Sequence, residues 1–192
     1  MNKIAISLGW NCFSASHSVD VGLRKRKIDG YNTCPFDMMV SNYKGIIECI
    51  HDDFKYFCDE DYLILIKEGE EENVIKNTKY KFVLNHESPG HANLYITENW
   101  KEGTNHFINN NYHHLKERYQ KRIENFRNYV SDPNNFITFV ITTWKKTQDD
   151  FSELHDAIKK RYPNLQYELL ILDDPNGEEY YTRHMKYVGM IE

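Results

Sequence analysis

The chain has 192 residues, of which 40% are hydrophobic and 14% aromatic, so it is long enough and apolar enough for one domain with a packed core. Its 24 basic and 29 acidic side chains give a net charge of −5 at pH 7, which argues against a general nucleic-acid-binding protein and predicts no attraction to anionic lipid. We therefore predict one domain over residues 1–192, without a nucleic-acid or membrane partner and without a cofactor. The oligomeric state is left open.

The sequence also lacks segments that direct a protein into or across a membrane. No apolar stretch reaches the roughly 20 residues that a membrane-spanning helix needs. The first residues, MNKIAISLGW, have neither the long apolar region nor the cleavage site of a signal peptide. No Cys-x-x-Cys pair is present, so neither a zinc knuckle nor a thioredoxin motif is expected. Because no export signal is seen, reduced thiols and a cytoplasmic protein are expected. The cysteines are Cys12, Cys34, Cys49 and Cys58.

The first quarter of the chain predicts a strand and two helices joined by a packed loop. Residues 3–8 form an apolar, strand-like run that a glycine ends, and residues 12–26 can continue as a helix. Residues 31–42 combine turn-forming Asn and Pro with Phe and Met, which indicates a loop packed against the body. Residues 41–54 predict a second helix with Ser41 as its N-cap.

The middle of the chain mixes short strands with one long helix. Residues 61–66 and 79–88 have strand composition, and residues 90–109 indicate an irregular surface segment that could cover a site. From Tyr112 onward, apolar side chains recur at the spacing of a helix. These side chains are Leu115, Tyr119, Ile123, Phe126 and Val130.

The last third predicts a strand–helix–strand unit. Residues 136–144 are apolar on both faces, as in a strand of a parallel sheet. Residues 147–162 form an amphipathic helix, residues 167–175 hold another buried strand, and residues 186–191 can form a last one. The crossover of such a unit is right-handed. We predict an α/β fold: a single domain with a largely parallel, Rossmann-like sheet and helices on both faces.

Polar residues follow four of the predicted strands, at positions 9–12, 85–88, 142–144 and 173–174. In an open parallel sheet, the ligand crevice lies beyond the carboxyl ends of the strands. If the four strands are parallel neighbours, one crevice gathers a thiol, an imidazole, hydroxyls and carboxylates. This convergence is the main functional signal that we draw from the residues themselves.

Cys12 stands where the first strand turns into a helix. The N–H groups and dipole of a helix N-terminus lower the pKa of a thiol, which favours the nucleophilic thiolate. Backbone N–H groups of the same turn, around Gly9, Trp10 and Asn11, could hold an oxyanion. The alternative is that Cys12 is a small buried apolar side chain, as many free cysteines are. The other three cysteines are expected to be packing residues.

His86 is the preferred general base, because it ends a strand and has the polar neighbours Glu87 and Ser88 to orient its ring. A surface or capping histidine is the alternative interpretation, and His91 is the reserve candidate. No metal site is expected, because the spacing matches no compact ligand set among His86, His91, His113 and His114.

Two carboxylates are candidates for a third site residue. Asp37 lies in an apolar loop, where it needs a partner such as His86 or Arg24, unless it caps the helix that follows. Asp173 ends a buried strand and could complete a Cys-His-Asp arrangement, although Asp-Asp-Pro is also good turn chemistry. Trp144 completes the predicted binding residues.

The segment SLGWNC, followed by LRKRKIDGYNTCPFDMM, resembles a family described as papain-like cysteine peptidases, with the pattern Ser-Leu-Gly-x-x-Cys, then Leu-Arg and Pro-Phe-Asp-Trp. The matching residues are Ser7, Leu8, Gly9, Cys12, Leu23, Arg24, Pro35, Phe36 and Asp37. Met38 stands where the pattern has Trp, which changes packing of the loop more than chemistry. The stretch around His86 and the strand at residues 136–144 are similar to family segments as well. So is a helix containing Arg118, Arg122 and Arg127.

This resemblance implies peptidase-like chemistry, and the order of Cys before His agrees with it. A papain-like fold, however, packs its nucleophile helix against a mainly antiparallel barrel, so we keep the parallel sheet that the residues predict. The leading hypothesis is a cysteine-dependent hydrolase or acyltransferase. In it, Cys12 attacks a carbonyl, His86 transfers the proton, and Asp37 or Asp173 orients the imidazole.

Two hypotheses of other classes stay open. A non-catalytic α/β domain could bind a nucleotide, a sugar or another small anion at the helix N-terminus after Gly9. A protein-interaction module could instead use the aromatic residues near the C-terminus, around Tyr180 and Tyr181. The residues do not say whether the substrate is a peptide or a small molecule.

Overall fold

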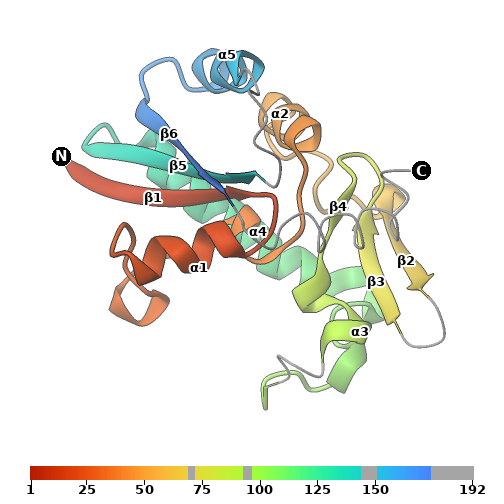
Figure 1. Ribbon diagram of the computed structural model, residues 1–192. Helices are drawn as coiled ribbons and strands as arrows, with labels where there is room; N and C mark the ends of the chain where they lie inside the picture. The colour runs from red at the N-terminus through yellow and green to blue at the C-terminus, as the bar shows by residue number, and fades with distance from the viewer. Residues whose placement is uncertain (69–71, 93–96, 144–150, 174–192) are drawn as a thin grey trace.

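A parallel sheet of three strands forms one part of the molecule. The computed structural model describes residues 1–68, 72–92, 97–143 and 151–173. Its parallel strands are β1 (Asn2–Gly9), β5 (Asn135–Thr143) and β6 (Gln166–Asp173), in the order β1-β5-β6 (Figure 1). The predicted strand–helix–strand unit is confirmed, because β5 and β6 are parallel and a helix connects them. The described part of the chain thus has a mixed α/β fold, and three parallel strands alone do not establish a Rossmann-like sheet.

The helices lie between and around the strands in chain order. They are α1 (Phe13–Asp20), α2 (Tyr43–His51), α3 (Pro89–Ala92), α4 (Asn109–Ser131) and α5 (Ser152–Arg161). Short 3-10 turns complete the elements: η1 (Lys27–Asp29), η2 (Pro35–Met38), η3 (Glu60–Tyr62), η4 (Asn85–Glu87) and η5 (Gly103–Asn105).

Helices cover both faces of the parallel sheet. On one face α1 packs so closely that the hydroxyls of Ser14 and Ser7 lie 2.5 Å apart. On the other face Phe126 of α4 stacks on Phe139 of β5, with ring centroids 6.2 Å apart. The register of β1 with β5 and the alternation of side chains along a strand put Ser7 and Phe139 on opposite faces.

A second sheet is antiparallel. It comprises β2 (Leu63–Glu68), β3 (Glu72–Asn77) and β4 (Phe82–Val83), in that order. The expectation that residues 79–88 join the parallel sheet is therefore wrong. A tight turn is the physical reason, because the amide of Tyr80 donates to Oδ1 of Asn77 and Lys81 has a positive φ, so that the chain folds back on β3.

The loop at residues 31–42 packs into the core as predicted, through its buried Phe36. This ring contacts four other aromatic rings from α4, β4 and the segment after α2: Phe54, Phe57, Phe82 and Phe126. Helix α2 begins one residue later than expected. Asn42 is its N-cap and accepts a 2.8 Å bond from the amide of Gly45, because the hydroxyl of Ser41 donates to the carbonyl of Leu8 instead.

The long helix α4 agrees with its predicted pattern, since all five predicted apolar residues are buried. Its regular part begins at His113, because residues 110–112 have positive φ. The C-terminal half of α4 packs on the parallel sheet (Figure 1), whereas its N-terminal half contacts η3 through Lys116 and η4 through Arg118. Within the described ranges, no helix is both long and apolar enough to cross a bilayer. The predicted strand at 186–191 and residues 147–150 of the predicted helix lie outside those ranges.

Candidate functional site

The turn between β1 and α1 carries Cys12 at the carboxyl edge of the parallel sheet. Gly9 ends β1 with φ +100°, and a Cβ at this position would collide with the hydroxyl of Ser41. The carbonyl of Gly9 also accepts a 3.0 Å bond from the hydroxyl of Thr142 in β5. Only glycine satisfies both this backbone conformation and this close approach. The glycine at position 9 therefore correctly predicted the end of the first strand.

Cys12 itself is half-buried and is the N-cap residue of α1. Its carbonyl accepts the first helical bond, from the amide of Ser16 at 3.0 Å. The side chain of Asn11 accepts a 2.9 Å bond from the amide of Phe13, which fixes the first turn of the helix. The thiol thus stands at the N-terminus of a helix, as predicted, where helix N–H groups favour an anion.

The other described thiols have a different environment. Burial raises the pKa of the Cys34 and Cys49 thiols well above the usual range. It also raises the pKa of the Cys58 thiol to about 12. These three groups are thiols rather than thiolates at neutral pH, in agreement with their predicted role in packing.

Trp10 connects this turn to the second sheet. Its side chain is buried in a cluster with Val40, Val74 and Val83. Its carbonyl accepts a 2.6 Å bond from the amide of Ser41. Trp10 is therefore a structural contact between β1 and the edge of the antiparallel sheet.

His86 follows β4 in the 3-10 turn η4 and is buried. Three residues before His86, Val83 pairs with Val40. Ser41, which follows Val40, donates its amide to the carbonyl of Trp10. Residues 40–41 therefore contact both the Cys12 turn and the strand that leads to His86. The expectation that both segments follow neighbouring strands of one parallel sheet is wrong, because the strand before His86 belongs to the antiparallel sheet.

The ring of His86 lies in a mixed electrostatic environment. Burial is the largest influence and lowers its pKa below the usual value of about 6.5. The nearby charge of Glu87 raises this pKa, whereas Arg122 and His91 lower it. With a lowered pKa, the imidazole is neutral at pH 7 and can accept a proton, which a general base must do.

Glu87 is fully buried and lies in an ion cluster with α4. Oε1 lies 3.0 Å from Arg118 and 3.1 Å from Arg122, and Oε2 accepts a 3.0 Å bond from the hydroxyl of Tyr119. This cluster attaches η4 to α4. The neighbouring Ser88 also has a structural role, because its hydroxyl donates to Leu84 and accepts from the amide of β3 residue Ile75.

Asp37 and Arg24 form a second buried cluster. Arg24 was one of the two partners that the sequence suggested for this carboxylate, the other being His86. Oδ1 of Asp37 lies 2.7 Å from the guanidinium of Arg24. Its Oδ2 accepts from the hydroxyl of Tyr31 at 3.0 Å and from the amide of Cys34 at 2.8 Å. Burial lowers the pKa of Arg122, while the charges of Glu87 and, more weakly, Asp37 raise it. Both clusters therefore act on Arg122.

The carboxyl ends of the three parallel strands share one edge, as predicted for these three. Gly9 pairs with Ile141, and Thr143 pairs with Asp173. Asp173 is exposed at this edge. Trp144 lies outside the described residues.

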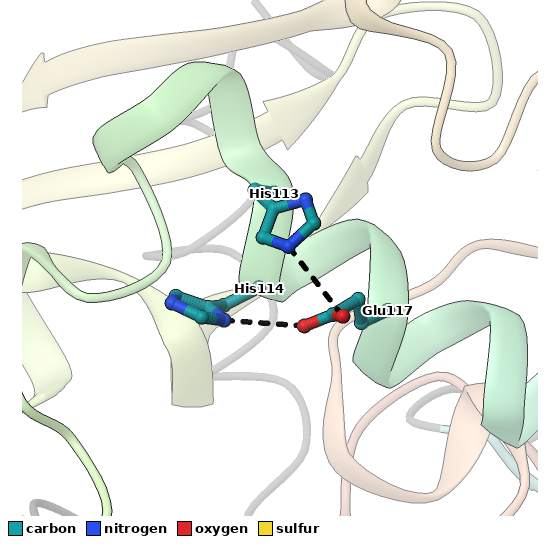
Figure 2. Close-up of side chains that lie close together, drawn as sticks. All are labelled: His113, His114 and Glu117. Carbon is teal, nitrogen blue, oxygen red and sulfur yellow. Dashed lines mark hydrogen bonds and ion pairs between the residues drawn. The ribbon is translucent and has the colours of Figure 1, made fainter.

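A group of possible metal ligands was not expected from the sequence. His113, His114 and Glu117 lie together at the start of α4 (Figure 2). The ligand set considered from the sequence combined His113 and His114 with two other histidines, His86 and His91, and with no carboxylate. The signal that could have found this group is the spacing of four residues between His113 and Glu117, because such residues share one face of a helix.

Comparison with known proteins gives one family. The family model described as "Putative papain-like cysteine peptidase (DUF1796)" matches residues 3–174. This range covers both the Cys12 turn and the His86 segment. No curated protein and no solved structure gives a significant match.

Proposed function

We propose, from the premise that this chain belongs to the family of putative papain-like cysteine peptidases, that it is a cysteine-dependent hydrolase of the peptidase type with Cys12 as its nucleophile. One observation carries the proposal. Among the described thiols, Cys12 is the one at the N-terminus of an α-helix, and burial raises the pKa of the other three, including Cys34 at the start of the 3-10 turn η2.

The proposed reaction uses two residues for bond making and proton transfer. His86 accepts the thiol proton, and the sulfur of Cys12 forms a bond to the substrate carbonyl carbon while the π electrons move to oxygen. Backbone N–H groups of the turn at residues 10–12 stabilise this oxyanion, because the amide of Phe13 already donates to the side chain of Asn11. When the intermediate collapses, the bond to the leaving group breaks and the imidazolium of His86 gives the leaving group its proton.

The acyl-enzyme then reacts with a second nucleophile. Water attacks the thioester carbon while His86 takes a proton from it, and the sulfur leaves as the regenerated thiolate. If another nucleophile replaces water, the same steps describe an acyltransferase. The lowered pKa of His86 supports this role, because the ring is unprotonated when it must accept a proton.

The predicted carboxylates have different places in the proposal. Asp37 is committed to Arg24, Tyr31 and the amide of Cys34, so we assign it the positioning of the loop beside the site. Asp173 stands at the sheet edge that carries the Cys12 turn and is kept as the candidate that orients His86.

Labelling with an epoxide-based cysteine-peptidase probe tests the proposal. Intact-mass and peptide analysis should find one adduct, on Cys12, and Cys12→Ser should abolish it. His86→Gln should slow labelling by about a hundredfold or more, which is the usual range of a general base, whereas Cys58→Ser should leave the rate unchanged. Labelling of Cys12 no faster than that of free cysteine would instead favour a binding domain without this chemistry.

A further inference from the structure

Three possible metal ligands lie on the first turns of α4 (Figure 2). Nε2 of His113 lies 3.4 Å from Oε1 of Glu117, and Nδ1 of His114 lies 3.2 Å from Oε2 of the same carboxylate. The ligand atoms all lie within 4.8 Å of one another. Two ligands bound at about 2.1 Å around a tetrahedral zinc ion lie about 3.4 Å apart. Only small side-chain rotations therefore separate the observed arrangement from one that encloses a cation.

The local structure explains why these side chains converge. Glu117 follows His113 by four residues and His114 by three, and both spacings bring side chains together on a helix. Residues 110–112 have left-handed backbone conformations, so the regular helix starts at His113. Glu117 consequently stands between the two imidazoles and contacts both.

The ring of His114 is held in place by a stack of aromatic rings. The ring of His106 is parallel to it, with centroids 4.1 Å apart and planes 11° apart. The ring of Trp100 is also nearly parallel to that of His106, with centroids 6.2 Å apart and planes 12° apart. The ring of His106 is itself buried, so the stack is anchored in the body of the protein. The stack leaves Nδ1 of His114 directed at Glu117 and reduces the side-chain freedom that binding would remove.

Glu117 supplies the negative charge of the cluster, and the basic residues on either side of it pair with other carboxylates. Lys116, the residue before it, pairs with Glu60 at 2.6 Å, and Arg118, the residue after it, pairs with the buried Glu87. The ion-pair partners of Glu117 within the described residues are the two imidazoles. Nearby cations are thus directed to other carboxylates, and a cation at the cluster would meet one negative charge.

We propose that His113, His114 and Glu117 bind a divalent transition-metal ion of the zinc class, with water completing its coordination. Two imidazole nitrogens and one carboxylate oxygen suit zinc and its neighbours in the first row, whereas calcium and magnesium prefer oxygen ligands throughout. The site is separate from the proposed chemistry of Cys12, so each can fail without the other.

Titration calorimetry with zinc chloride tests the proposal. The full chain is first treated with iodoacetamide so that accessible thiols cannot bind the metal. We expect one equivalent to bind, and His113→Asn and Glu117→Gln each to weaken binding by about tenfold or more. His51→Asn, at an exposed histidine of α2, is the matched control and should bind like the parent. Unchanged affinity in both ligand variants, or equal loss in the control, would overturn the proposal.

Cobalt(II) provides a second measurement that does not depend on the folding of a variant. The parent chain with cobalt should show the visible bands of a tetrahedral site with nitrogen and oxygen ligands, and equimolar zinc should remove them. A near-ultraviolet band from thiolate-to-cobalt charge transfer would place the ion on cysteine instead. That result, or the absence of any saturable spectrum, would contradict the assignment to α4.

Discussion

The hydroxyl of Tyr119 donates a 3.0 Å hydrogen bond to Oε2 of Glu87, across 32 residues of sequence. The same carboxylate meets Arg118 and Arg122, so three side chains from α4 hold the turn that carries His86. This buried contact ties the candidate base to the longest helix of the fold. The position of His86 therefore depends on a charge cluster that has no direct part in the proposed reaction.

The first prediction concerns this cluster. Glu87→Gln keeps the size of the side chain but removes the charge that compensates the buried guanidinium of Arg122. Breaking a buried ion pair in this way typically costs about 3–5 kcal/mol of the free energy of unfolding. Urea unfolding at pH 7 measures this cost. Glu124→Gln is the control, because it breaks an exposed pair with Lys121 on the same helix and should cause no measurable loss. Equal stabilities of the two variants would refute a structural role for Glu87.

The second prediction separates the two reasons why position 9 requires glycine: its positive φ and its close contact with Ser41. Gly9 and Gly30 have nearly the same φ, +100° and +102°, but only Gly9 faces another side chain closely, that of Ser41. Gly30→Ala should cost about 1–2 kcal/mol through the left-handed backbone alone. Gly9→Ala should cost more in the same urea experiment, and adding Ser41→Ala should recover part of the excess. If the two alanine variants were equally stable, the close approach at the Cys12 turn would not matter.

Local patterns were sufficient where the determining contacts are themselves local. The apolar residues of α4 recur at helical spacing, and all five are buried. The turn at Gly9 and the start of the helix that follows Cys12 were also predictable, because backbone conformation and glycine content are properties of adjacent residues. The same holds for the loop that buries Phe36. The helix after Cys12 is itself shorter than the predicted 12–26, since α1 ends at Asp20.

Long-range pairing was not predictable from such patterns. Residues 79–88 have the composition of a strand, but composition does not specify that Val83 pairs with β3 in a separate antiparallel sheet or forms an isolated bridge with Val40. The partners of Glu87 lie 31–35 residues away on another element, so a local reading could only treat this carboxylate as a site candidate. Asp37 was closer to prediction, because Arg24 was one of the two partners considered for it.

The third prediction concerns pH. Burial lowers the pKa of His86 in the folded protein below that of the unfolded chain, about 6.5. As pH falls below 6.5, the unfolded chain binds a proton that the folded protein does not, so the unfolded state gains stability. The free energy of unfolding should therefore fall between pH 7.5 and the folded pKa, and His86→Gln should make this fall shallower.

Urea unfolding at several pH values measures that slope. His106 shifts in the same direction, so part of the dependence should persist in His86→Gln and disappear only when His106→Gln is added. His51→Gln controls for the removal of one exposed imidazole. A slope identical in the parent and in the double variant would show that buried histidines do not cause the pH dependence.

The last prediction ranks the thiols by their burial. With its pKa raised to about 12, Cys58 exists as thiolate to only about 1 part in 10⁴ at pH 8, whereas a free cysteine with a pKa of about 8.5 is about one quarter thiolate. Iodoacetamide should therefore alkylate Cys58 about a thousandfold more slowly than free cysteine. Cys34 and Cys49 should react only when the protein unfolds, because their side chains are fully buried. Peptide mass spectrometry of a time course measures all four rates in one sample. The same sample in guanidinium should show four similar rates, and fast labelling of Cys58 under native conditions would contradict the environment described for it.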